Sequence, residues 1–367
     1  MSTATIDIPA IERQLTSLWR QASTDVESGV IRSSTSNLLV YLSEDYDSSD
    51  FEEAMTHIAA ERPCRALVMY VDHNGVDSTI TADVTSRCTL PTGSSKQVCC
   101  EQVTINASGS QINEIPSAIA PLLIPDLPVY LWWRAEPRLR DRGIFGKLVE
   151  IADRVVIDSA RFIDPMRDLV AEAELLRDNP RLTAISDLNW ARLNAWRALI
   201  AGFYDLQEYR PFLSELSRVV IEHSRPEGTD APISLRALLL GGWLASRLGW
   251  QIKHHESSGT GHSFTFESAG REVLLHFVTT ERKIEPARLA KVTLESAADP
   301  SAVFSVRRST DSTRIETMAT AGGSTRRQRV LGYENIPESA LLIRELDLLG
   351  HDRVYEQAVI AAAEMKF

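Results

Sequence analysis

The sequence predicts an α/β domain in its N-terminal half and an α+β domain with an antiparallel sheet in its C-terminal half. The length of 367 residues fits two domains, because a domain usually contains about 100–200 residues. In the first half, apolar strand-like runs alternate with helix-like segments, as in an α/β sheet. After residue 250, short strand-like segments separated by turn residues predominate. We place the boundary near residue 180, which gives domains of residues 1–180 and 181–367.

The first half opens with a helix and then a β-α-β pattern. The first helix is expected from about Pro9, a residue that suits a first helical turn. Residues 38–42 and 66–71 are near-continuous apolar runs, which are typical of strands covered on both faces. Between them, Ser49 and Glu52 have the spacing of a capping box, so a helix is expected to begin there.

Two segments of alternating polarity interrupt this pattern. Residues 78–86 and 97–107 flank the turn-like residues 91–93, which predicts an antiparallel hairpin. Alternating helices and strands then resume, with expected elements at residues 115–123, 129–133, 143–152, 154–159 and 166–177. Together, the patterns predict a Rossmann-like three-layer sheet with an inserted hairpin.

The second half begins with helices and continues as strands. Residues 188–204 predict one amphipathic helix, and residues 235–248 predict an apolar helix that Ser234 can cap. A helical segment from Pro337 to Met365 is broken at Gly350. Strands are expected at residues 218–223, 251–256, 262–267, 272–280, 289–295, 302–307, 314–320 and 326–331.

Composition and charge exclude several classes of partner and location. The net charge of −11 argues against nucleic acid or an anionic membrane as the main partner, because both favour clustered Lys and Arg. No apolar stretch approaches the length of a membrane span, and the N-terminus has no secretory signal pattern. Four cysteines are too few for a disulfide framework in a chain of this length. We therefore expect a cytoplasmic protein with free thiols.

The cysteines leave one redox alternative open. Cys99 and Cys100 are neighbours in a predicted strand, and a disulfide between neighbours would be strained. Buried free thiols are the favoured interpretation. A redox switch that joins Cys64 to Cys88 or to Cys100 is the alternative, although no sequence motif supports it.

The chain lacks the usual sequence signals of a nucleotide enzyme. Residues 42–50, which follow the first predicted strand, contain no glycine and four acidic residues, so they would repel a pyrophosphate. The sequence contains neither a Walker A lysine motif nor a Gly-x-Ser-x-Gly nucleophile motif. We therefore expect neither a catalytic residue nor a nucleotide cofactor.

Two further patterns favour ordinary structural interpretations. Residues 322–327 could cradle an anion, but Gly-Gly between two strands is a common hairpin turn. Four histidines could ligate zinc, but neighbouring residues of a strand point to opposite faces, so surface positions are favoured. These are His254, His255, His262 and His276. We therefore expect no metal site.

Tryptophan and arginine occur together in two segments, and these residue types dominate binding hot spots. One segment is a strand end that contains Trp133 and Arg134, and the other is the predicted helix after Asp187. On that helix two tryptophans six residues apart point to different faces. We expect Trp190 in the core and Arg192 stacked on Trp196 at a partner surface. The candidate interface residues are Trp133, Arg134, Arg192 and Trp196.

Five segments between residues 62 and 192 carry a resemblance to a known family. They are Arg62–Arg65, Gln97–Val103, Leu123–Trp133, Asp153–Ser159 and Asp187–Arg192. In this order they resemble segments of the OpcA family of glucose-6-phosphate dehydrogenase assembly proteins. The resemblance implies a non-catalytic protein that binds this dehydrogenase, promotes its active state and supports NADPH production in the oxidative pentose phosphate pathway. Photosynthetic members are associated with thiol redox control, but this chain has no cysteine after Cys100 to match it.

A rival interpretation assigns chemistry to the N-terminal domain. Arg134, Arg138, Arg140 and Arg142 form a basic cluster after a predicted strand, where they could bind a sugar phosphate. The chain would then be an enzyme that acts on a phosphosugar, or a sensor that reports it to a partner. The missing glycine loop and the missing base–nucleophile pair argue against the enzyme.

Overall fold

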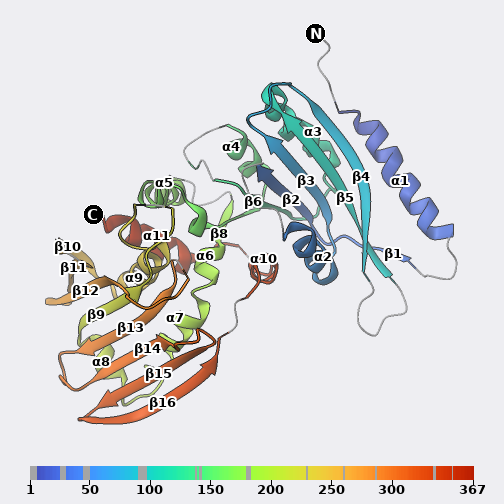
Figure 1. Cartoon of the computed structure of the whole chain (residues 1–367). Helices are drawn as coiled ribbons and strands as arrows, with labels where there is room; N and C mark the ends of the chain where they lie inside the picture. Colours follow the sequence, from blue (N-terminus) through green and yellow to red (C-terminus); the bar gives the residue numbers. More distant parts are fainter. Residues whose placement is uncertain are drawn as a thin grey trace. The chain divides into compact units, whose positions relative to one another are not determined.

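The chain forms two compact units, and each unit is assembled from three separate stretches of sequence (Figure 1). Unit 1 contains residues 1–158, 179–188 and 337–352, and unit 2 contains residues 159–178, 189–336 and 353–367. The computed structural model describes residues 6–24, 30–43, 50–89, 97–136, 139, 143–178, 183–228, 230–258, 261–285, 287–333, 336–348 and 350–367. The boundary expected near residue 180 remains a prediction about folding domains.

Unit 1 is built on an eight-stranded, mainly parallel sheet with the order β1-β5-β3-β2-β6-β7-β8, and β4 pairs with β5. If β2 is counted as strand 1, the run β5-β3-β2-β6-β7-β8 has the order 3-2-1-4-5-6, which is that of a Rossmann-type sheet. The strands are β1 (Val30–Arg32), β2 (Asn37–Ser43), β3 (Arg65–Asp72), β4 (Ile80–Thr89), β5 (Gln97–Ser108), β6 (Val129–Arg134), β7 (Arg154–Ile157) and β8 (Ala184–Asp187). The predicted α/β class is therefore present, with β8 as a strand that the sequence patterns did not predict.

The two segments of alternating polarity form an antiparallel pair. Ile80 of β4 lies opposite Ala107 of β5, and the pairing continues to Thr89 and Val98. β5 also pairs in parallel with β3 and β1, so it belongs to the main sheet as well as to this pair. The expected turn at residues 91–93 lies outside the described residues.

The helices of unit 1 come from both ends of the chain. They are α1 (Ile8–Thr24), α2 (Phe51–Glu61), α3 (Ile115–Ile119), α4 (Ile144–Val149) and α10 (Glu338–Leu346), with short 3₁₀ turns at Gly109–Glu114 and Ala120–Leu122. Helix α10 packs against α2, and His57 Nδ1 forms a hydrogen bond of 2.9 Å with Ser339 Oγ. Leu341 and Leu342 are fully buried. The C-terminal segment therefore completes the core of unit 1.

Unit 2 contains a mostly antiparallel sheet with the order β10-β11-β12-β9-β13-β14-β15-β16, in which only β9 and β12 pair in parallel. Its strands are β9 (Leu216–His223), β10 (Gln251–Ser258), β11 (Gly261–Ser268), β12 (Arg271–Thr279), β13 (Leu289–Ser296), β14 (Val303–Arg308), β15 (Arg314–Ala321) and β16 (Ser324–Gly332). Gly322 and Gly323 join β15 to β16 with φ of 60° and 72°. Glycine suits this hairpin turn because both positions need positive φ.

Three long helices of unit 2 pack together. Helix α11 (Arg353–Glu364) packs against both α9 (Leu235–Leu248) and α5 (Pro165–Asp178). The side chain of Ser234 accepts a hydrogen bond from the Ala237 N–H and caps α9, as its sequence predicts. The shorter helices are α6 (Leu188–Ala191), α7 (Asn194–Ala201) and α8 (Arg210–Ser214), with a 3₁₀ turn at Ser159–Arg161. None of the described helices is long and apolar enough to cross a membrane.

The expectation of four free thiols is wrong. Cys88 and Cys99 form a disulfide between β4 and β5, where the two residues lie directly opposite each other. Their Cα atoms are 4.0 Å apart. Cys64 and Cys100 are free and buried, and burial raises the pKa of both thiols. No cysteine motif indicates this pairing, because the register of β4 against β5 brings the two residues together.

We predict that Gly242→Ala destabilises unit 2. A Cβ at residue 242 would lie only 2.8 Å from both N and Cβ of Ala362 on α11, and closer still to the carbonyl oxygen of Ala358. Overpacking of this kind usually costs about 1–3 kcal/mol. Urea unfolding followed by circular dichroism should show this loss. Gly332→Ala is the control, because a Cβ there meets nothing within 4 Å; equal effects of the two substitutions would contradict the close helix packing.

We predict that the disulfide contributes measurably to stability. It joins residues 11 apart in sequence, and closing a loop of that size in the unfolded chain is worth about 3 kcal/mol. Urea unfolding without reductant should therefore show a loss of about this size for Cys88→Ser. Dithiothreitol should reduce the stability of the wild-type chain and leave the variant unchanged. Alkylation of all four cysteines in denaturant without reductant would disprove the disulfide.

Candidate functional site

The carboxyl end of β6 lies beside that of β2, where a Rossmann-type sheet usually binds its ligand. In this chain Arg134 occupies that position and is only 1% exposed. Its Nη2 lies 2.8 Å from Asp50 Oδ1 and 3.4 Å from Glu338 Oε2. Asp50 precedes α2, and Glu338 is the first residue of α10. The strand end is therefore occupied by an ion-pair cluster of the chain itself.

Aromatic rings surround this cluster and the neighbouring strand end. The guanidinium carbon of Arg134 lies 4.8 Å from the centre of the Trp132 ring. Trp133 stacks on Tyr41 with ring centres 3.8 Å apart, and it meets Phe145 edge-on at 4.8 Å. Trp133 Nε1 donates to the carbonyl oxygen of Glu136 at 3.2 Å. Both predicted interface residues of this strand are thus buried side chains with partners in unit 1.

The N-terminus of α2 is acidic. Asp50 is the N-cap residue, and Glu52 and Glu53 follow in the first turn. A phosphate group would normally approach backbone N–H groups at such a helix end, but three carboxylates repel an anion there. The Asp50 side chain bonds to Arg134 instead of capping the helix. Ser49, the expected start of a capping box, lies outside the described residues.

A second buried arginine binds the same C-terminal segment. Arg154 on β7 donates to Ser186 Oγ at 2.6 Å and to the carbonyl oxygen of Leu348 at 2.9 Å, and it also donates to the carbonyl oxygen of Gly350. Burial lowers the pKa of Arg154 and raises that of the nearby Glu345 carboxyl, while the opposite charges of the two groups counteract both shifts. Residues 337–352 are therefore attached to the sheet by arginines from two adjacent strands.

The prediction of one long helix after Asp187 is wrong. The segment forms α6 and α7, with a turn at residues 192–193 between them. Arg197 lies over Trp190, with its guanidinium carbon 3.4 Å from the ring centre. Trp190 also contacts Tyr355, with ring centres 5.7 Å apart. Trp190 is buried, as expected.

Trp196 is also buried, with an exposed fraction of 1%, so its expected position at a surface is wrong. It belongs to α7, which packs on β14 of the sheet in unit 2. The expected surface position of Trp196 depended on one continuous helix from residue 188, whereas residues 192–193 form a turn. Arg192 is partly exposed in this turn, and its role at a partner surface remains a prediction.

The structure describes the four histidines but only part of the basic cluster at residues 134–142. Arg134 is held in an ion-pair cluster, while Arg138, Arg140 and Arg142 lie outside the described residues. The rings of His255 and His262 stack, with Nε2 and Nδ1 of the respective rings 3.2 Å apart. In the described part of the chain, no three His, Cys, Asp or Glu side chains are arranged to hold a metal ion.

Comparison with protein families identifies the chain. Residues 55–174 match the glucose-6-phosphate dehydrogenase subunit N-terminal domain, and residues 183–359 match the corresponding C-terminal domain. The chain belongs to the OpcA family. The five segments that suggested this family are thus supported over both halves of the chain.

Similar proteins agree with this membership. The OxPP cycle protein OpcA of Nostoc punctiforme is 33% identical over 66% of this chain and 48% of its own length. The OxPP cycle protein OpcA of Synechococcus elongatus is 31% identical over 83% of this chain and 69% of its own length. The chain thus spans about half the length of the Nostoc relative. Among solved structures, the 3-ketoreductase KijD10 of Actinomadura kijaniata has a TM-score of 0.50 at 9% identity, covering 89% of this chain and 94% of that one. This likeness concerns the fold alone.

We predict that Trp196→Ala destabilises the fold. Emptying a buried large aromatic site usually costs about 3–5 kcal/mol, and thermal unfolding followed by circular dichroism will measure the loss. Val76→Ala is the control, because Val76 is 98% exposed and its truncation should change stability by less than about 0.5 kcal/mol. An unchanged melting temperature for Trp196→Ala, combined with weaker binding to a partner, would restore this tryptophan to the interface.

Proposed function

We propose that the chain is a non-catalytic assembly factor and allosteric activator of glucose-6-phosphate dehydrogenase. It would thereby support NADPH production in the oxidative pentose phosphate pathway. Membership of the OpcA family supplies the partner. The observation that carries the non-catalytic part is the cluster of Arg134, Asp50 and Glu338, which occupies the strand ends where a Rossmann-type oxidoreductase would hold its cofactor.

The electrostatics of this strand end support the same conclusion. A dinucleotide needs close backbone approach and a helix N-terminus that is free to face phosphate. Here the helix N-terminus carries Asp50, Glu52 and Glu53. A buried arginine could attract phosphate, but Arg134 already faces the carboxylates of Asp50 and Glu338. An oxidoreductase-like fold is therefore combined with a strand end that is ill suited to a nucleotide.

Activation requires only a difference in affinity between two states of the dehydrogenase. If the chain binds the active oligomer tenfold more tightly than the inactive form, the equilibrium shifts by about 1.4 kcal/mol. No group of the chain needs to enter the dehydrogenase active site. Because Trp133, Arg134 and Trp196 are buried in this chain, we favour other residues for the contact, and Arg192 stays a candidate.

The rival proposal of a phosphosugar enzyme or sensor based on residues 134–142 is not favoured. Its first arginine has a structural role in the cluster with Asp50 and Glu338. A chain that oxidises glucose 6-phosphate on its own would nevertheless support the rival enzyme, so the two proposals make opposite predictions about the isolated chain.

We predict activation without intrinsic turnover. The pure chain should not reduce NADP with glucose 6-phosphate, because its strand end carries carboxylates instead of a cofactor site. Added to the cognate dehydrogenase, it should lower the KM for glucose 6-phosphate or raise kcat, as measured by NADPH absorbance. An equal concentration of serum albumin controls for non-specific stabilisation. Unchanged KM and kcat at saturating excess would refute the proposal.

A further inference from the structure

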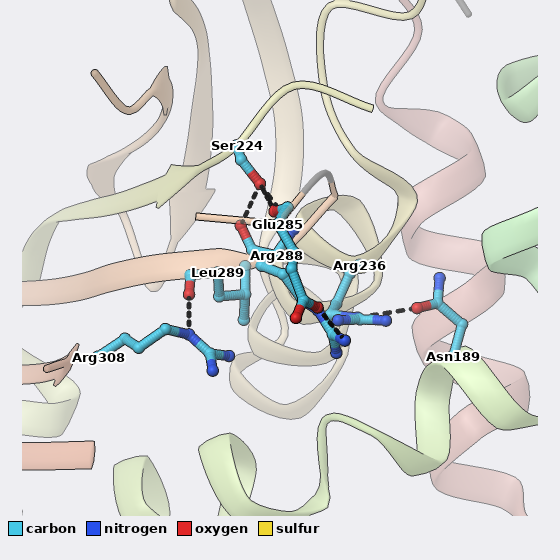
Figure 2. Close-up of polar contacts among 7 residues, drawn as sticks. All are labelled: Asn189, Ser224, Arg236, Glu285, Arg288, Leu289 and Arg308. Atoms are coloured by element: carbon cyan, nitrogen blue, oxygen red, sulfur yellow. Dashed lines mark hydrogen bonds and ion pairs between the residues drawn. The ribbon is translucent and has the colours of Figure 1, made fainter. Parts of the chain in front are cut away.

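One end of the sheet in unit 2 gathers arginines from several neighbouring strands. Arg308 ends β14, and Arg288 directly precedes β13. These two strands pair with each other, and β13 also pairs with β9. Figure 2 shows Arg288 and Arg308 together with the residues that hold this end of the sheet. The family resemblance gave these arginines no role, and the anion-cradle motif considered in the sequence lies elsewhere, at residues 322–327.

Arg308 is a buried cation with an incomplete set of partners. Its side chain is 5% exposed. Its Nε donates to the carbonyl oxygen of Leu289 at 3.1 Å, and its guanidinium carbon lies 4.5 Å from the centre of the Tyr333 ring. Within the described residues, neither terminal Nη group has a hydrogen-bond or ion-pair partner. These nitrogens are not among the enclosed polar atoms of the described residues, so a ligand can reach them from solvent.

A cavity of about 60 Å³ lies against this guanidinium. Its lining residues, which we call the Arg308 site, are Ile284, Glu285, Arg288, Arg308, Ser312 and Tyr333. A water molecule takes about 30 Å³ of liquid volume, so this space accommodates about two waters.

The charge of the site favours an anion. Among the described lining residues, Arg288 and Arg308 are cationic and Glu285 is acidic. The Glu285 side chain is 69% exposed, whereas that of Arg288 is only 17% exposed. Arg288 nevertheless forms an ion pair with Glu285, with Nε 2.8 Å from Oε2, so the net positive charge of these three side chains comes from Arg308. Ser312 and Tyr333 add hydroxyl groups, which can donate to an oxyanion.

The backbone of the site is held before any ligand binds. Ser224 Oγ donates to the carbonyl oxygen of Glu285 at 2.6 Å and accepts from the Arg288 N–H at 2.9 Å (Figure 2). The Ser224 N–H donates to the Arg288 carbonyl oxygen at 2.8 Å. On the other side, Arg282 donates to the carbonyl oxygens of Arg308 and Ser309 at 2.8 Å and 2.9 Å. A site fixed in this way loses little entropy on binding.

We propose that the Arg308 site binds the phosphoryl group of a small molecule. A phosphoryl group would compensate Arg308 and could accept from its Nη groups, a geometry that guanidinium groups favour. Arg236 is not part of the site; its Nε donates to Asn189 Oδ1 at 2.9 Å (Figure 2). The proposal concerns the chain alone and does not depend on its activity toward the dehydrogenase.

The test is a calorimetric titration of the full chain with inorganic phosphate at constant ionic strength. The expected result is saturable binding, accompanied by a rise in melting temperature, because a ligand that binds only the folded state stabilises it. A parallel titration with glucose 6-phosphate distinguishes the source of the phosphoryl group. Tighter binding of the sugar phosphate assigns the site to an ester, and equal or weaker binding assigns it to free phosphate. Binding of neither ligand would overturn the proposal.

Substitutions locate the binding. Arg308→Gln should weaken phosphate binding at least tenfold, which corresponds to about 1.4 kcal/mol. Arg314→Gln makes the same charge change at a side chain that is 55% exposed, pairs with Asp311 and lies outside the cavity lining; it should bind as the wild type does. Arg288→Gln provides a second test if Arg308→Gln fails to fold. Equal losses in the Arg288 and Arg314 variants, or equally tight binding of acetate, would overturn the phosphoryl assignment.

Discussion

Two buried arginines on adjacent parallel strands determine how the chain is organised. Arg134 and Arg154 bind residues 337–352 through Glu338 and through the carbonyl oxygens of Leu348 and Gly350. Removing one partner of a buried ion pair typically costs about 3–5 kcal/mol, so these contacts hold the late segment 337–352 in unit 1.

The ion-pair cluster of Arg134 also affects what the Rossmann-type sheet can bind. In such a sheet the carboxyl ends of the strands usually bind a cofactor. Here Arg134 uses that position to hold Glu338 and Asp50, and the Tyr41–Trp133–Phe145 stack packs beside it. The strand end thus contributes to stability, and a role through binding a partner is consistent with that arrangement. The Arg308 site in unit 2 differs, because among the described residues the Arg308 side chain donates to a backbone carbonyl oxygen and forms no ion pair with a carboxylate.

Local sequence patterns predicted the elements far better than their long-range contacts. The apolar run at residues 38–42 and the cap at Ser234 each depend on nearby residues, and both behave as expected. The short strand Ala184–Asp187 escaped prediction because four residues are too few to show a period. The Arg134–Glu338 pair joins residues 204 apart, and no local signal reports it. Trp196 was misplaced because no local pattern reports the packing of α7 on β14, which buries this side chain.

Hydrogen–deuterium exchange of the chain, alone and mixed with its cognate glucose-6-phosphate dehydrogenase, tests the central claim most directly. The claim is that the chain binds this enzyme through its surface, while Arg134 and Trp196 serve the fold. The account predicts slower exchange in a limited set of surface peptides of the mixture, with the already protected peptides of β6 and α7 unchanged. Exchange that is identical in both samples at saturating dehydrogenase would contradict it.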